Sequence, residues 1–140
     1  VLVARGASAG ATGQVMAAIV PDEAGRRVAA AARDWFGAST IAFVHSLRLP
    51  EEGQMRLQGY GEDAIAAMRT AMIRDAEGQF DFFRAAYPGA TIRIDVGFPA
   101  STLLAAAMAM KPDAVVLGAH GGTRTEERYL GSVAQFMLYN

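Results

Sequence analysis

The residues best suited to chemistry stand in one glycine-rich segment, Gly118 to Ser132. Gly118 and Gly121 are three residues apart, and after nine further residues Gly131 and Ser132 follow. Glycine lets the backbone adopt positive φ and lets a ligand approach without a Cβ in the way. The spacing suits a loop whose backbone N–H groups hold an anion.

The flanks of this segment support the same interpretation. Asp113–Leu117 before it is a short, β-branched apolar run, typical of a buried strand. Val133–Leu138 after it is typical of the start of a helix. A glycine-rich loop between a strand and a helix N-terminus brings several backbone N–H groups to one place. The sequence therefore predicts a phosphate-binding loop.

The composition narrows the classes of function. A chain of 140 residues is one ordinary domain, and a net charge of −1 argues against a dedicated nucleic-acid binder. With no cysteine and only His45 and His120, the chain has no thiolate site and little material for zinc. The longest apolar stretch is about half the ~20 residues that span a bilayer. We expect a soluble, cytoplasmic domain that binds neither nucleic acid nor membrane.

Apolar runs typical of strands alternate along the chain with apolar patterns typical of helices. The strands expected are Gln14–Val20, Thr40–His45, Thr91–Val96 and Asp113–Leu117. The helices expected are Glu23–Phe36, Glu62–Tyr87, Ala100–Met110 and one from Val133, with Leu47–Gly61 as a polar connection. This alternation predicts an α/β fold of three layers, an open parallel sheet of Rossmann-like type with helices on both faces.

Two of these helices show which face should be buried. Asp22 is placed to cap the first helix. The expected apolar stripe of that helix consists of Val28, Ala31, Ala32 and Trp35. The apolar face of the long second helix consists of Ile65, Met68, Met72, Ala76, Phe80, Phe83 and Tyr87. Because its steps of three and four fit a helix, we interpret this face as core rather than as a cofactor site.

The fold class also predicts where a ligand binds. In open parallel sheets the ligand crevice lies beyond the carboxyl ends of the strands, where the strand order reverses. The loop after Leu117 and the turn at Val20–Asp22 both leave such ends. A fold class names no function by itself, so the functional inference depends on the loop.

The loop and its surroundings resemble a known family over roughly Gln14 to Asn140. Gly118-x-x-Gly121, nine residues, then Gly131-Ser132 is similar to the nucleotide-binding motif of the universal stress protein family, in its ATP-binding branch. Further segments that resemble the family are Pro112–Gly121 and Leu130–Ala134 (fourth strand and loop), Gly97–Pro99 (the Gly-x-Pro turn after the third strand) and Phe43–His45 (end of the second strand).

The resemblance implies a sheet of order 3-2-1-4-5, counted from the Gln14–Val20 strand, with ATP bound across strands one and four. It implies that Gly118 and Gly121 let the backbone approach the phosphates and ribose. The terminal phosphates would be held by Gly131, Ser132 and Val133 through backbone N–H groups and the Ser132 hydroxyl. These contacts suit ATP with a divalent cation such as Mg²⁺, although no carboxylate stands out as a metal ligand.

Other residues of the implied site have plainer alternatives. His120 and Gly122 lie in the loop, where His120 is more simply a positioning residue than a phosphate ligand or base, because no partner is indicated nearby. Ser46 stands at a position that helps frame adenine, in place of a usually apolar residue. His45 is expected to be a satisfied residue near the core.

The end of the first strand departs from the family. Val20 stands where the family often has an aspartate that meets the nucleoside, and Asp22 falls where a helix-capping serine usually stands. Capping is the plainer interpretation of Asp22. The departures at Val20 and Ser46 bear on the nucleoside side of the site more than on the phosphate side.

The two ends of the chain predict an unusual division. Residues 1–6 resemble the family's fifth strand, residues 7–13 form a linker, and residues 14–140 form a universal stress protein domain that stops before its own fifth strand. One hypothesis is a segment of a tandem protein that starts in the last strand of a preceding domain. The alternative is that Val1–Arg5 folds back or swaps to supply strand five. Because the family often dimerises through strand five, we expect a homodimer or a tandem-domain partner there.

The expected function is an ATP-binding module of stress response, in which nucleotide occupancy changes contacts with partners. The alternative is a dimerisation or interaction domain of the same family that binds no nucleotide. Dedicated catalysis is not expected, because the chain has none of the loops Gly-x-x-x-x-Gly-Lys-Ser/Thr, His-x-Gly-His or Ser-Gly-Gly-x-Asp-Ser. Slow ATP hydrolysis stays open as a side activity.

Overall fold

The computed structural model describes residues 2–5, 13–37, 40–118 and 132–139 of the chain. Its strands are β1 (Leu2–Arg5), β2 (Gln14–Ala18), β3 (Thr40–Leu47), β4 (Thr91–Val96) and β5 (Ala114–Leu117). Its helices are α1 (Glu23–Phe36), α2 (Glu52–Leu57), α3 (Glu62–Gln79), α4 (Asp81–Ala86), α5 (Pro99–Met110) and α6 (Ser132–Tyr139). From β2 onward helices separate successive strands, as the apolar patterns predicted.

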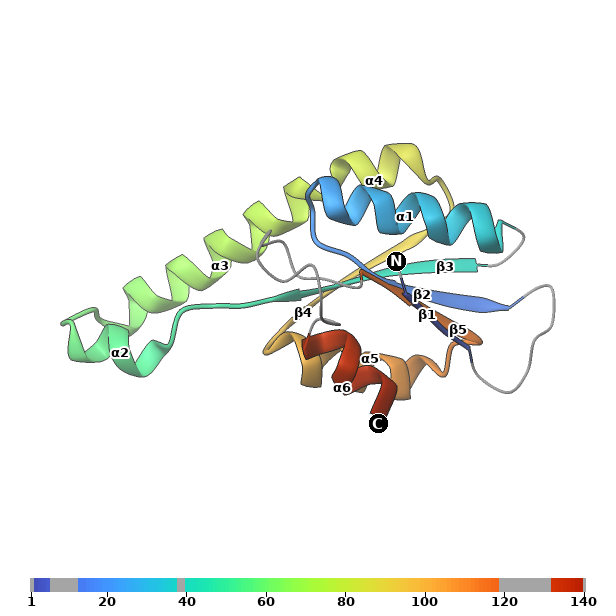
Figure 1. Cartoon of the computed structure of the whole chain (residues 1–140). Helices are drawn as coiled ribbons and strands as arrows, with labels where there is room; N and C mark the ends of the chain where they lie inside the picture. Colours follow the sequence, from blue (N-terminus) through green and yellow to red (C-terminus); the bar gives the residue numbers. More distant parts are fainter. Residues whose placement is uncertain (1, 6–12, 38–39, 119–131, 140) are drawn as a thin grey trace.

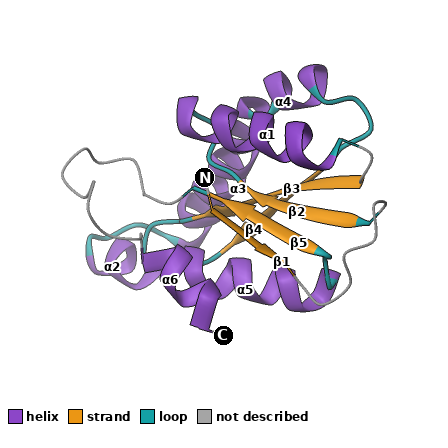
Figure 2. Ribbon diagram, turned by 45° about the vertical axis from the view of Figure 1, so that its right-hand side comes forward, coloured by secondary structure: helices purple, strands orange, loops and turns teal. Residues whose placement is uncertain are grey.

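Helices cover both faces of the sheet. α1 and α4 lie on one face, and α5 and α6 lie on the other (Figures 1 and 2). The central strands are therefore buried on both sides, which is why β3 is apolar without interruption from Ile41 to Val44. The α/β class, the helices on both faces and the Rossmann-like character are confirmed.

The sheet differs from the expected order at one edge. β4, β3, β2 and β5 are neighbours in that order and run parallel, which is 3-2-1-4 when counted from the Gln14 strand. The position beyond β5 holds β1, which runs antiparallel with Leu2 opposite Leu117 and Arg5 opposite Ala114. The predicted parallel sheet of order 3-2-1-4-5 is therefore wrong in its fifth strand.

The direction of β1 follows from where its connection to β2 begins and ends. Arg5 lies opposite Ala114, and the next residue back, Asp113, donates its backbone N–H to the carbonyl oxygen of Gln14 (2.8 Å). Both ends of the connection thus lie at the amino end of β5. A parallel β1 would need the connection to run back along the whole strand, so antiparallel pairing is the shorter path. The division into residues 1–6, 7–13 and 14–140 stays a prediction.

Two apolar clusters hold the helices on the sheet. On the α1 and α4 face, Phe43, Phe80 and Phe83 are each at most 1% exposed, and the rings of Phe43 and Phe83 meet edge to face at 5.9 Å. On the other face, buried Met16 and Val44 form a cluster with residues of α5 and α6. The core is thus two layers of side chains separated by the sheet.

The buried face of α1 is rotated from the predicted stripe. Its buried residues are Gly25, Val28, Ala29 and Ala32. Phe36 also packs against the core, whereas Trp35 is 54% exposed, so its assignment to the buried stripe is wrong. Glycine and alanine at the contact let the helix lie close to the sheet, and this approach fixes the rotation that turns Trp35 outward.

The predicted helix Glu62–Tyr87 is in fact two helices, α3 and α4, with Phe80 between them. Phe80 is fully buried, and the Arg84 guanidinium donates to the carbonyl oxygen of Glu77 (2.8 Å) at the end of α3. Gly78 lowers helix propensity just before the break. The change of direction lets Phe80 and Phe83 both enter the core while α3 leads away from it.

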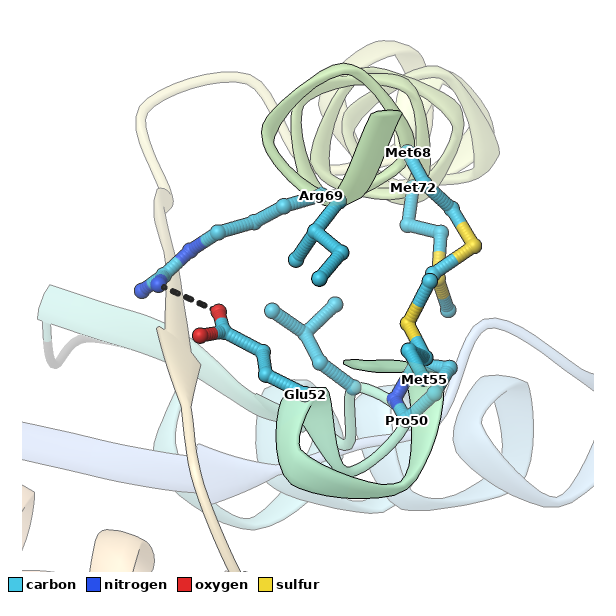
Figure 3. Close-up of a pocket in the computed structure, with 8 residues that line it drawn as sticks. Pro50, Glu52, Met55, Met68, Arg69 and Met72 are labelled. Carbon is cyan, nitrogen blue, oxygen red and sulfur yellow. Dashed lines mark hydrogen bonds and ion pairs between the residues drawn. The ribbon is translucent and has the colours of Figure 1, made fainter. Parts of the chain in front are cut away.

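Residues 49–79, which we call the arm, extend beyond the sheet (Figure 1). The arm contains α2, a helix within the segment Leu47–Gly61 that was predicted only as a connection; six residues without a side-chain cap give little periodic signal. A small, open pocket lies between α2 and α3 (Figure 3). It is lined mainly by Leu49, Pro50, Met55, Ile65, Met68 and Met72. The Arg69 guanidinium closes one side through an ion pair with Glu52 (3.4 Å).

Candidate functional site

Predicted site residues from three separate segments meet at the carboxyl edge of the parallel strands. β2 lies between β3 and β5, with Ala18 opposite Val44 and Ala17 opposite Val116. Val20 follows β2, Ser46 lies near the end of β3, and Gly118 follows β5. Since parallel strands end at a common edge, the structure brings these three residues to one side of the sheet.

The turn from β2 into α1 is tightly built. The carbonyl oxygen of Val20 accepts the N–H of Asp22 (2.8 Å), and the Asp22 carboxylate accepts the N–H of Gly25 (2.8 Å). The prediction that Asp22 caps α1 is therefore confirmed. A Cβ on Gly25 would stand 1.7 Å from the Val20 oxygen, so only glycine fits there. Sequence reasoning missed Gly25, whose signal was a glycine in the first turn of a predicted helix.

Val20 presents an apolar side chain at this edge and is 53% exposed. The neighbouring Asp22 carboxylate is already engaged as the cap of α1. The turn from β2 into α1 thus presents an apolar group at this edge and not a free carboxylate.

His45 joins the ends of β2 and β3. Its Nδ1 lies 3.0 Å from the carbonyl oxygen of Ile19, and its ring tilts against Phe80 with 5.3 Å between centroids. Burial lowers the pKa of His45 from its ordinary value, against the opposing effects of the Ile19 carbonyl and the Asp22 carboxylate. Donation to Ile19 uses the Nδ1–H tautomer. The expectation of a satisfied histidine near the core is confirmed.

Ser46 links β3 to the turn after β4. Its hydroxyl donates to the carbonyl oxygen of Gly97 (2.9 Å), and the Gly97 N–H donates to the carbonyl oxygen of Leu47 (3.1 Å). Gly97 has a φ of +155°, and a Cβ there would stand 2.4 Å from the Thr102 hydroxyl oxygen. The Ser46 hydroxyl therefore positions the Gly-x-Pro turn, which is a structural reason for a serine at this place.

An aromatic residue at the same edge escaped the sequence reasoning. Phe98 is 60% exposed, and the Arg48 guanidinium lies over its ring at 5.0 Å. Phe98 follows Gly97 in the chain, and Arg48 is two residues after Ser46. Together they add a flat apolar surface and a positive charge to the carboxyl edge of the sheet. Its signal in the sequence was an aromatic residue inside a turn motif.

The predicted phosphate loop lies largely outside the described residues. His120, Gly121, Gly122 and Gly131 all fall in that part of the chain. The described chain resumes at Ser132, the first residue of α6, and Val133 is half-buried in the cluster with Met16. The first turn of α6 is therefore anchored to the core. No group of three or more potential metal ligands occurs among the described residues.

The fold and this edge define a Rossmann-like α/β domain with a glycine-rich segment after its last parallel strand. The sequence profile of the universal stress protein family matches residues 13–140, and the chain belongs to that family. No curated protein sequence is similar enough to count as a match.

Solved structures with the same fold are similar over nearly the whole chain. The hypothetical protein MJ0577 has a TM-score of 0.71 and 16% identity, with 91% of this chain and 88% of that chain covered. The universal stress protein UspA from Lactobacillus plantarum has a TM-score of 0.61 and 17% identity, with 90% of each chain covered. A universal stress protein in complex with cAMP has a TM-score of 0.51 and 21% identity, with 91% and 88% covered.

Among the described helices, none is both long enough and apolar enough to cross a membrane.

Proposed function

We propose that this chain binds ATP at the carboxyl edge of its sheet and serves as a nucleotide-responsive regulatory module in stress response. The main support for the proposal is the path of the chain at the carboxyl ends of the parallel strands. Gly118 leaves β5 next to β2, and the described chain returns as an α-helix whose first residue is Ser132. A helix N-terminus facing a strand end favours a bound anion.

The residues proposed for the phosphates are those of the motif. Gly118 and Gly121 allow close approach of the backbone, and Gly131, Ser132 and Val133 supply N–H groups at the start of α6, with His120 and Gly122 in the same loop. Val20, Ser46 and the exposed ring of Phe98 frame the nucleoside on the other side. That a related universal stress protein was solved in complex with cAMP supports a nucleotide as ligand.

The charges of the described edge suit phosphates more than a protein-held cation. Asp22 caps α1, and Asp95 pairs with Arg93 at 2.7 Å, so neither is free to bind Mg²⁺. A divalent cation would therefore be held chiefly by the phosphate oxygens. This fits a nucleotide-binding module better than an enzyme that orients a metal for phosphoryl transfer.

Calorimetric titration of the purified protein with ATP, ADP and cAMP tests the proposal. We expect ATP to bind with a dissociation constant of millimolar or below, and Gly121→Val and Ser132→Ala to weaken it. Gly53→Val is the control, because an added Cβ there meets nothing within 4 Å and α2 lies away from the strand ends. Absence of ATP binding would contradict the proposal, and intact ATP after long incubation would exclude slow hydrolysis.

The second candidate is a dimerisation or interaction domain that binds no nucleotide. The exposed, apolar Val20 favours it, because the one carboxylate on this turn, that of Asp22, is engaged in capping α1 and is not free to meet a nucleoside. A Val20→Asp variant separates the two candidates. If the chain binds nucleotide, the variant changes the dissociation constant; if neither form binds, the second candidate stands.

A further inference from the structure

Helix α3 has two opposite faces, and within the described part of the chain only one of them packs against other elements. Ile65, Met68 and Met72 line the pocket toward α2 (Figure 3). On the opposite side Asp63, Ala67, Thr70 and Arg74 follow one another at steps of four, three and four, which places them on one stripe. All four are exposed. We call this stripe the outer face of α3.

The charges of the outer face are not used within the described chain. Glu52, Arg56, Glu62 and Arg69 form a connected set of ion pairs on the inner side of the arm. By contrast, Asp63 and Arg74 form no ion pair with any described residue. Two opposite charges therefore stand about three helical turns apart on one exposed stripe.

This stripe is complementary to itself in the antiparallel direction. A two-fold axis passing between residues 68 and 69 places Asp63 opposite the partner's Arg74, and Ala67 opposite the partner's Thr70. The same axis repeats both pairs with the two copies exchanged, as a symmetric dimer requires. Small side chains in the middle let two helices approach closely, and the charges at the two ends set direction and register.

The two ends of the arm differ, since one presents exposed apolar side chains and the other an open hollow. Leu57 is 90% exposed and Tyr60 is 53% exposed, both at the tip of the arm. At the other end of α3 an open hollow is lined by Ala71, Arg74, Asp75, Gly78 and Gln79. A Cβ on Gly78 would meet nothing within 4 Å. With the arms antiparallel, the apolar tip of each arm points toward the end of the partner's α3 that carries this hollow.

We propose that the outer face of α3 binds a second copy of this chain, with the two arms antiparallel and each tip seated against the body of the partner. This interface is separate from the β1 edge of the sheet, where the family resemblance predicted dimerisation. It requires no nucleotide and holds whether or not the carboxyl edge binds ATP.

Analytical ultracentrifugation of the chain and of charge-reversed variants tests this interface. We expect the wild-type chain to form a dimer that weakens with added salt. Asp63→Arg and Arg74→Glu should each raise the dissociation constant at least about tenfold, because each turns two attractive contacts into repulsive ones. Mixing the two variants should restore the dimer, since every Asp63–Arg74 contact between different copies is then attractive.

The controls separate this interface from others. Arg27→Glu makes the same change of charge on the exposed side of α1 and should leave the dimer unchanged. Because the chain has no cysteine, Ala67→Cys mixed with Thr70→Cys should form a disulfide-linked heterodimer under oxidation, and Ala105→Cys on α5 should not. A monomer at every concentration, a dimer that neither reversal weakens, or no recovery on mixing would overturn the proposal.

Discussion

The body of the molecule and its arm are held together in different ways. In the body, the sheet separates two apolar clusters, and residues such as Phe43 and Met16 are fully buried. In the arm, one row of apolar side chains joins α2 to α3, and exposed ion pairs such as Arg56 with Glu62 lie beside it. Substitutions at the buried positions of the body should therefore be costly, whereas most side chains of the arm are exposed and can contact a partner.

The largest expected difference comes from deleting an aromatic ring in the body. Phe43 is fully buried, and its ring meets Tyr87 edge to face at 5.2 Å. Phe43→Ala should lower the free energy of unfolding by about 3–5 kcal/mol, from lost burial and the cavity left behind. Urea denaturation measures this loss. Phe82→Ala, at a site 45% exposed, is the control and should cost about 1 kcal/mol. Equal losses at the two sites would contradict the comparison.

Two helical glycines, one in the body and one in the arm, provide a second comparison of the effect of a substitution on stability. Gly25→Ala in the body forces a Cβ against the Val20 carbonyl oxygen at 1.7 Å, so we expect a loss of about 3 kcal/mol. Gly53→Ala in α2 of the arm has open space and should gain about 0.5 kcal/mol. Thermal unfolding of both variants gives the signs. A neutral Gly25→Ala would show that the β2–α1 turn is not fixed by this contact.

A methionine of the arm should have a smaller and more local effect. Met55 is 7% exposed and packs in the α2–α3 pocket. Met55→Ala should cost about 2 kcal/mol, since the open pocket lets neighbouring side chains relax. Amide hydrogen exchange should speed up in α2 while β2 and β3 keep their protection. Equal acceleration in the sheet would mean that arm and body unfold as one unit.

The smallest expected effect is a dependence of the free energy of unfolding on pH that comes from His45. Because burial lowers the pKa of His45, the unfolded chain binds its proton more readily than the folded one. The free energy of unfolding should therefore be highest above the ordinary pKa of 6.5 and fall as pH drops below it. His45→Asn keeps a donor for Ile19 and should remove this share of the slope. Urea denaturation at several pH values compares the wild-type chain with His45→Asn. If the free energy of unfolding changes with pH equally in both, the prediction is wrong.

Local signals in the sequence predicted most elements of the body and the edge that holds the site. Asp22 capped α1 as expected, and Thr91–Val96 formed the predicted strand, because capping and alternation depend on neighbours in the chain. The placement of Val20, Ser46 and Gly118 at one edge followed from the parallel strands. The phosphate contacts of Gly121 and Ser132 stay predictions.

The errors arose where distant residues decide the outcome. Trp35 turned outward because small residues of α1 set its contact with the sheet. The helix broke at Phe80 because two phenylalanines of one segment enter the same core. Neither reason is visible in periodicity, which describes one segment at a time.

By itself, the sequence determined the alternation of strands and helices, the glycine-rich segment after β5 and the family to which the chain belongs. Only the tertiary structure decided that β1 lies antiparallel at the edge, that Gly25 must lack a Cβ and that α3 leaves the body as an arm. The physical reason is that propensity, capping and apolar period act between near neighbours. Edge pairing, close approach of backbones and the exposure of a helix face arise only when remote segments pack together.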